Sequence, residues 1–146
     1  NFEKNLLFSK TDPKADYYIN YSTHASLGEV VKIMKEDNDT LFVSPDAWLV
    51  YWQSDTNHLP KLFGYYTWMA GVPPLHQAVL EAFEKSPPTF FYCNNCRELD
   101  LGKYLIRYKE IKKEGGHTNL YALPEKINNL TKQQKFQLNF HKISLE

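Results

Sequence analysis

The sequence predicts an α/β fold with a mainly parallel central sheet, helices on both faces of the sheet, and a C-terminal hairpin and short helix. Two observations predict the central sheet: the alternation of two kinds of segment, and the turn residues between them. Short apolar runs rich in β-forming residues alternate with amphipathic segments, and turn residues separate them. The third observation is a Gly-Gly pair between two alternating segments near the end, which predicts the hairpin at one edge of the sheet.

The first predicted helix lies in "STHASLGEVVKIMKEDND", where Ser26 and Glu29 have the spacing of a capping box. Its apolar residues recur at the helical period on one face: Leu27, Val30, Val31 and Met34. The run "TLFVS" follows at once and predicts a buried strand. Residues 1–26 are predicted to be an N-terminal linker or extended segment, and residues 27–146 a single α/β domain.

The middle of the chain repeats the alternation of helix and strand. "PDAWLVYWQSD" predicts a short aromatic helix, and "KLFGYY" predicts a second strand. Pro73 and Pro74 open a second amphipathic helix, "PLHQAVLEAFEKS", and "PPTFFYC" predicts a third apolar strand.

After Cys96 the pattern changes. Tyr104, Ile106 and Tyr108 alternate with polar and apolar neighbours, which predicts a strand before the Gly-Gly turn. A second strand follows the turn. Thr131 and Gln134 have capping-box spacing, so a short helix is expected to close the chain.

Composition limits the classes of function. The chain of 146 residues has 17 basic and 17 acidic residues and no formal net charge, so recognition of nucleic acid by charge is not expected. The histidines are dispersed without metal-ligand spacing, and no glycine-rich loop suits a phosphate. We therefore expect no metal and no cofactor. Aromatic residues make up 15% of the chain, enough for a core and for a binding groove.

Cys93 and Cys96, the only cysteines, form a C-x-x-C motif at the end of a predicted strand. Such a motif can be a redox centre, and a thiol-disulfide oxidoreductase is one functional alternative. Zinc would need two further ligands, which the later histidines do not supply at a suitable spacing. The commoner outcomes are two ordinary thiols, or a local disulfide where the compartment is oxidising.

An aromatic groove is the second candidate site. Asp46, Trp48, Tyr51 and Trp52 follow the carboxyl end of a predicted strand, where ligands bind in open α/β sheets, and Trp68 follows the next strand. Rings beside a carboxylate suit sugars, because rings stack on C–H faces and carboxylates accept hydrogen bonds from hydroxyls. The alternative is that the tryptophans pack a helix onto the sheet, with Asp46 as a helix cap.

Three stretches resemble a known family: "TLFVSPDAWLVYWQSDTNHLPKLFGYY", "PPLHQAVLEAFEKSPPTFFYCNN" and "TNLYALPEKINNLTKQQKFQLN". They are similar to the C-terminal soluble domain of polytopic membrane glycosyltransferases of the dolichyl-phosphate-mannose protein mannosyltransferase kind. The resemblance covers roughly residues 27–143 and rests on the order of elements and on the "EKSPPTFF" join.

The resemblance implies a non-catalytic, extracytoplasmic accessory domain of a membrane protein that uses a lipid-linked sugar. The family's catalytic carboxylates lie near its first membrane helices, so no residue of this chain takes a catalytic role from it. A chain that opens on Asn1 without an initiator methionine is expected to be a piece of such a parent. Its expected partners are a glycan or lipid-linked sugar, and the membrane through the parent segment. A protein-interaction module is the remaining alternative.

Overall fold

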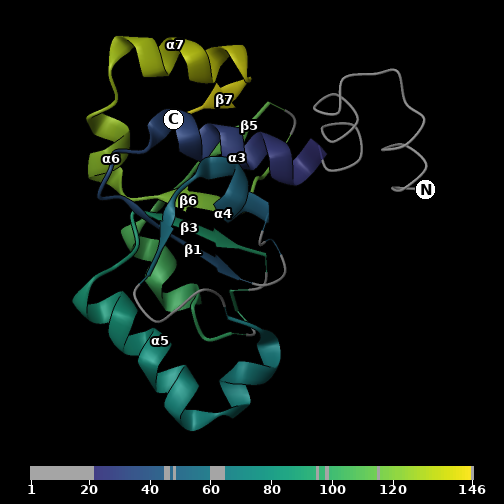
Figure 1. Cartoon of the computed structure of the whole chain (residues 1–146), viewed down its shortest axis with the longest axis vertical. Coiled ribbons are helices and arrows are strands. Elements are labelled where there is room, and N and C mark those ends of the chain that lie inside the picture. The colour runs from purple at the N-terminus through teal and green to yellow at the C-terminus, as the bar shows by residue number, and fades with distance from the viewer. Residues whose placement is uncertain are drawn as a thin grey trace, which may run out of the picture.

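The structure of the protein, a computed structural model, describes residues 22–44, 47, 49–59, 65–94, 96–97, 99–114 and 116–145. A five-stranded mixed sheet in the order β2-β1-β3-β6-β4 forms its centre (Figure 1). These strands are β1 (Thr40–Ser44), β2 (Asn57–His58), β3 (Phe90–Cys93), β4 (Lys109–Glu110) and β6 (Leu120–Ala122). A second, two-stranded sheet pairs β5 (Lys112–Lys113) with β7 (Ile143–Ser144).

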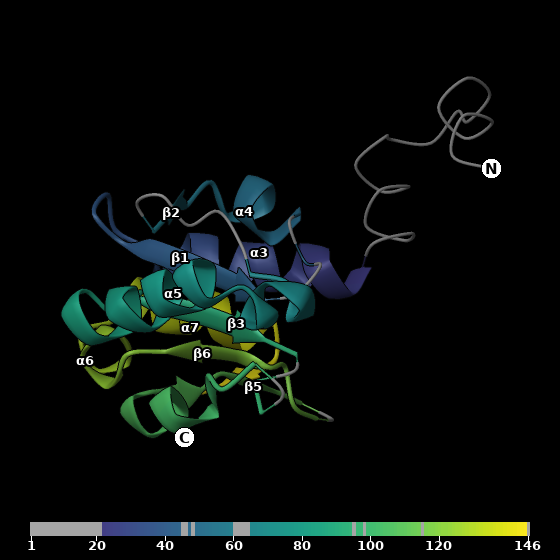
Figure 2. The same ribbon diagram turned by 90° about the horizontal axis from the view of Figure 1, so that it is seen from below.

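The helices lie on both faces of the central sheet, as the sequence predicts. Figure 2 shows α5 on the viewer's side of β3, with α3 and α7 behind the sheet. The helices are α3 (Ser22–Met34), α4 (Leu49–Ser54), α5 (Pro73–Lys85), α6 (Pro124–Asn128) and α7 (Lys132–Phe140), with the 3-10 helices η1 (Thr67–Gly71) and η2 (Gly102–Arg107). Among the described residues, no helix combines the length and the apolar character that crossing a bilayer requires.

The strand pairing divides the sheet into a parallel and an antiparallel half. β1 is parallel to β2 and to β3, and Ser44 pairs with Cys93, so the carboxyl ends of β1 and β3 lie side by side. β6 runs antiparallel to both β3 and β4. Antiparallel strands are therefore confirmed at one edge of the sheet, although the first of them, β4, starts only at Lys109.

Each face of the sheet has its own buried core. One face, which we call the aliphatic core, gathers mostly Leu, Val, Ile and Met side chains from α3, α4, α6, α7 and the strands. The other face, the aromatic core, includes Phe42, Tyr65, Phe83, Phe91, Tyr104 and Tyr108 together with both cysteines. The alternation of side chains along β1 produces this division, because Leu41 and Val43 face one core and Phe42 faces the other.

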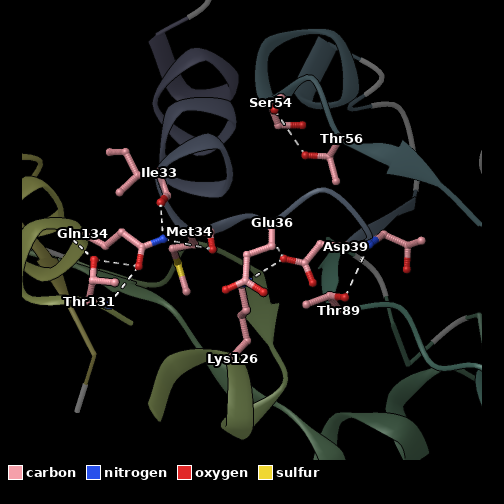
Figure 3. A network of polar contacts seen from close by, with 11 residues as sticks. Ile33, Met34, Glu36, Asp39, Ser54, Thr56, Thr89, Lys126, Thr131 and Gln134 are labelled. Carbon is pink, nitrogen blue, oxygen red and sulfur yellow. Dashed lines mark hydrogen bonds and ion pairs between the residues drawn. The ribbon is translucent and has the colours of Figure 1, made fainter. Parts of the chain in front are cut away.

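A polar network fixes the end of α3 against α6 and α7 (Figure 3). The Gln134 amide donates to the carbonyl of Ile33 at 2.9 Å, which satisfies one of the free carbonyls at the end of the helix. Lys126, only 8% exposed, lies 2.6 Å from Asp39 Oδ2 and 3.3 Å from Glu36 Oε1. The buried ammonium is thereby paired with two carboxylates, which offsets part of its desolvation cost.

The termini of several predicted helices are confirmed, and others are corrected. Thr131 and Gln134 form the predicted capping box at the start of α7, and Pro73 opens α5. α3 begins at Ser22, however, so Ser26 lies inside the helix and the predicted capping box at Ser26 is wrong. Residues 22–26, predicted to be linker, belong to this helix, while residues 1–21 lie outside the described part of the chain.

The strand predicted through Tyr104, Ile106 and Tyr108 is wrong, because this segment forms η2. Tyr104 and Tyr108 are buried whereas Ile106 is 91% exposed, which a two-residue repeat cannot produce. The spacing of Leu101, Tyr104 and Tyr108 is helical and would have predicted the observed element.

The strand predicted at "KLFGYY" lies mainly outside the described residues. Tyr65 and Tyr66, its last two residues, belong to no strand. Within the described part of the chain, the edge of β1 is instead paired with β2, which lies earlier in the sequence.

Candidate functional site

The carboxyl ends of β1 and β3 form the candidate site. After β1 the chain turns to α4, whose Val50 and Tyr51 enter the aliphatic core, and after β3 it turns to η2, whose Tyr104 enters the aromatic core. Neighbouring parallel strands whose connections leave to opposite faces create a crevice at their carboxyl ends, where open α/β sheets bind ligands. We call this region the carboxyl edge.

Two tyrosine segments meet at the end of β1. The Val43 N–H donates to the Tyr51 hydroxyl at 3.0 Å, and the Ser44 hydroxyl donates to the Tyr65 carbonyl at 2.7 Å. β2 pairs only with the first part of β1, so the Tyr51 hydroxyl satisfies a backbone donor beyond the reach of β2. The segments around Tyr51 and Tyr65 therefore converge on one strand end.

Tyr65, His76 and Asp100 form a chain of polar side chains at this edge. The Tyr65 hydroxyl is hydrogen-bonded to His76 Nδ1, and His76 Nε2 lies 3.9 Å from Asp100 Oδ2. When the proton is on Nε2, His76 Nδ1 accepts a hydrogen bond from the Tyr65 hydroxyl and Nε2 faces the Asp100 carboxylate. The chain joins the segment before η1, the first turn of α5 and the loop after Cys96.

Exposure differs along this chain. Tyr65 is 1% exposed, whereas the side chains of His76 and Asp100 are 23% and 65% exposed. Burial, and secondarily the negative charge of Asp100, raise the pKa of the Tyr65 phenol. A buried phenol of raised pKa is a poor nucleophile, so Tyr65 suits the role of an anchor, while His76 and Asp100 can meet a ligand.

Cys93 and Cys96 form a disulfide, with their Cα atoms 5.5 Å apart. Both residues are buried, at 4% and 7% exposure, in the aromatic core. The Cys96 carbonyl accepts hydrogen bonds from the N–H groups of Leu101 and Gly102 at 3.0 and 3.1 Å. The bridge and these bonds close the loop that presents Asp100, whose backbone adopts a left-handed conformation with φ of 56°.

The surroundings of this disulfide do not resemble those of a thiol-exchange centre. Exchange requires an accessible sulfur, and a helix N-terminus commonly stabilises the attacking thiolate. Cys93 is the last residue of β3, and the next described helix, η2, begins only at Gly102. The bridge is better suited to shaping the carboxyl edge.

An exposed aromatic pair lies on η1 and just before it. The rings of Tyr66 and Trp68 are stacked, with centroids 6.4 Å apart and planes 14° apart. Trp68 is 63% exposed, and its neighbours Met69 and Ala70 pack against the aromatic core. The stack leaves a large ring surface in contact with solvent at the start of α5.

The structure separates the residues predicted for the aromatic groove. Asp46 and Trp48 lie outside the described residues. Tyr51 is 6% exposed and its hydroxyl is bonded to Val43, so it cannot stack on a ligand. Trp52 is 72% exposed on α4, whereas Trp68 lies on η1, and these helices pack against opposite cores.

Sequence reasoning missed His76 and Asp100 as parts of the site. A signal for His76 was present: the two prolines mark the start of α5, and a helix that leads into a parallel strand starts at the carboxyl edge. Asp100 had no such signal, because its position depends on the loop closed by the disulfide.

Comparisons with known proteins give no relative. No model of a known protein family matches the chain, and neither the curated proteins nor the solved structures contain a match. Within the described ranges, no three His, Cys, Asp or Glu side chains cluster as metal ligands would.

Proposed function

We propose that the chain is an extracytoplasmic accessory domain of a membrane-bound transferase that uses a lipid-linked sugar, and that its carboxyl edge binds or orients a saccharide. The observation that carries this proposal is the exposed Trp68 ring, stacked on Tyr66, at the edge where α/β sheets bind ligands. The resemblance of residues 27–143 to the C-terminal domains of such transferases supports it.

The chemistry of this edge suits a sugar. A flat ring held by a stacking neighbour can pack against the C–H face of a pyranose with little loss of conformational entropy. Asp100 presents a carboxylate that accepts hydrogen bonds from hydroxyls, and His76 adds an imidazole. The buried Tyr65 hydroxyl is hydrogen-bonded to His76, so the imidazole is held in place before the ligand binds.

The disulfide supports the proposed location outside the cytoplasm. Disulfides persist in oxidising environments outside the cytoplasm and are rare inside it. Cys93 and Cys96 are bonded and buried, which suits a structural bridge in an extracytoplasmic domain.

Saccharide binding can be measured by saturation-transfer NMR with methyl α-mannoside, methyl α-glucoside and methyl β-galactoside. We expect a weak complex with at least one of them, with a Kd of about 1 mM or above, since one ring and a few exposed polar groups make the contact. Trp68→Ala should abolish the transfer and Asp100→Asn should weaken it. Ile106→Ser, at an exposed position on η2, is the matched control and should bind as the unchanged chain does.

Trp52→Ala distinguishes this site from the wider groove predicted from the sequence. If Trp68 carries the binding, Trp52→Ala leaves it intact; equal losses in both variants would favour a groove that crosses the carboxyl edge. No transfer from any of the three sugars, or transfer that survives Trp68→Ala, would remove the proposal. Circular dichroism of each variant checks that the fold is retained.

A further inference from the structure

Two phenylalanines project from the outer face of α7. Phe136 and Phe140 are 74% and 83% exposed, and their spacing of four residues places them on one face of the helix. Leu138, between them in sequence, is fully buried in the aliphatic core. The helix thus buries one apolar side chain and presents two larger ones to solvent.

The outward face of α7 is held in position by the rest of the fold. The Thr131 side chain accepts a hydrogen bond from the Gln134 N–H at 3.2 Å, which caps the helix start. The Gln134 amide reaches the carbonyls of Ile33 and Met34 at the end of α3 (Figure 3). Because α7 is anchored at its cap and through Leu138, its orientation toward solvent is a property of the folded domain.

The charged residues of α7 itself are basic. Residues 131–142 contain no Asp or Glu, and Lys132 lies four residues before Phe136 on the same helix face. The exposed Lys112 and Lys113 lie on β5, which pairs with the strand β7 that follows α7, and the neighbouring Glu114 is paired with Lys142 at 3.3 Å. The helix therefore combines two exposed apolar rings with Lys132 and Lys135 and carries no carboxylate of its own.

The size of the apolar patch argues against a protein occupant. Two phenylalanines bury at most about 300–500 Å². A stable protein interface needs about 800 Å² on each partner. A lipid surface needs no such area, since aromatic rings insert at the headgroup boundary and lysines are attracted to anionic headgroups at about 1 kcal/mol each.

We propose that α7 docks on an anionic lipid surface, with Phe136 and Phe140 inserted at the headgroup boundary and Lys132 and Lys135 beside the phosphates. This proposal does not depend on saccharide binding, because α7 lies at the opposite end of the molecule from α5 (Figure 1). A domain docked in this way presents the Trp68 side of the sheet away from the lipid.

Co-sedimentation with large unilamellar vesicles tests the docking. At about 0.1 M NaCl the chain should bind vesicles of phosphatidylcholine mixed with phosphatidylglycerol at least tenfold more tightly than pure phosphatidylcholine vesicles. The double variant Phe136→Ser/Phe140→Ser should lower the affinity about tenfold or more. The double variant Lys132→Gln/Lys135→Gln should bind more weakly and lose much of the salt dependence.

Ile106→Ser is the matched control, because Ile106 is a similarly exposed apolar residue on another helix, and its vesicle binding should stay unchanged. Three results would overturn the proposal: no binding to the anionic vesicles, equal binding to both kinds of vesicle, or unchanged binding of the double phenylalanine variant. Light scattering after size-exclusion chromatography can give a fourth result that would overturn the proposal. A dimer that the phenylalanine substitutions dissociate would assign the face to a second copy of the chain.

Discussion

The two faces of the central sheet bury different kinds of side chain. The aliphatic core contains mainly branched and linear apolar residues around Val31, Met34 and Leu41. In the aromatic core Phe83 makes edge-to-face contacts with Phe42 and Phe91, with ring centroids 5.1 Å and 4.9 Å apart. The same strands supply both faces, so the difference arises from alternate positions along β1 and β3.

This contrast shows that many of the aromatic residues serve to build one of the two cores. Tyrosines of the aromatic core join ring packing to polar anchoring, since the Tyr108 hydroxyl donates to the Pro88 carbonyl at 2.8 Å and Tyr104 to the Leu80 carbonyl at 3.4 Å. These bonds fix η2 and Tyr108 to α5 and to the segment before β3, on the face that carries η1 and Trp68. The high aromatic content is explained first by a core, and only its exposed remainder is available for binding.

The largest expected effect comes from the ring at the centre of the aromatic core. Phe83→Ala should lower the free energy of unfolding by about 4 kcal/mol, because it removes a fully buried ring and leaves a cavity. Leu138→Ala, its counterpart in the aliphatic core, should cost about 3 kcal/mol. Urea unfolding followed by circular dichroism measures both.

Phe83→Leu sharpens the same comparison. It keeps most of the apolar volume but loses the edge-to-face contacts, which contribute about 0.5–1.5 kcal/mol per pair beyond burial. A cost of at least 1 kcal/mol is therefore expected. A Phe83→Leu chain as stable as the original would mean that ring geometry adds nothing and that the two cores differ only in composition.

A smaller effect is expected from reduction of the disulfide. The bond closes a short loop, for which the chain-entropy relation gives about 2 kcal/mol of stabilisation. Urea unfolding with and without a phosphine reductant should show this difference, with near-ultraviolet circular dichroism changing because both cysteines lie among the aromatic rings. The double variant Cys93→Ala/Cys96→Ala must be insensitive to the reductant; if it responds as the original does, the effect does not come from this bond.

Removing a single hydroxyl compares one buried tyrosine from each core. Tyr51→Phe leaves the Val43 N–H without this acceptor and should cost about 2 kcal/mol. Tyr108→Phe removes the donor to the Pro88 carbonyl and should cost about 1 kcal/mol, since a buried carbonyl tolerates a missing partner better than an N–H does. Urea unfolding at neutral pH measures both costs, and the reverse order would contradict the roles given to these hydroxyls.

The same two tyrosines give a pH dependence of defined sign. Burial raises the pKa of both phenols above the ordinary value. Two smaller effects lower the pKa: the hydrogen bond from Val43 at Tyr51, and the charge of Arg107 at Tyr108. The folded state then holds these protons more tightly than the unfolded state does. Stability should therefore be fully present below about pH 10 and fall as the pH rises further. The fall should be shallower in each Phe variant.

Local signals in the sequence were sufficient to predict the main strands and helices. The apolar run at 40–44 and the run ending at Cys93 became the central parallel strands, and Thr131 with Gln134 capped α7 as expected. The prediction failed where an alternating pattern was read as a strand, at Tyr104 to Tyr108. There the buried residues Leu101, Tyr104 and Tyr108 follow a helical spacing, which the alternating pattern of Tyr104, Ile106 and Tyr108 obscured.

The candidate site was less accessible to prediction. Tyr51 and Tyr65 are both hydrogen-bonded at the carboxyl end of β1, but the predicted groove of Tyr51, Trp52 and Trp68 does not form there. Whether each ring faces the core or the solvent could not follow from residue type. Tyr51 turned inward and Trp68 outward because of the positions of α4 and η1 relative to the two cores.

The sequence by itself determined the strands β1 and β3, the alternation that separates two apolar faces, the prolines that begin α5 and the cap that begins α7, because each depends on residues close together in the chain. Only the tertiary structure decided that His76 and Asp100 approach each other, that Lys126 is paired with Glu36 and Asp39, and that Phe136 and Phe140 stay outside. Those contacts join segments far apart in sequence, and their geometry exists only once the sheet and its two cores have formed.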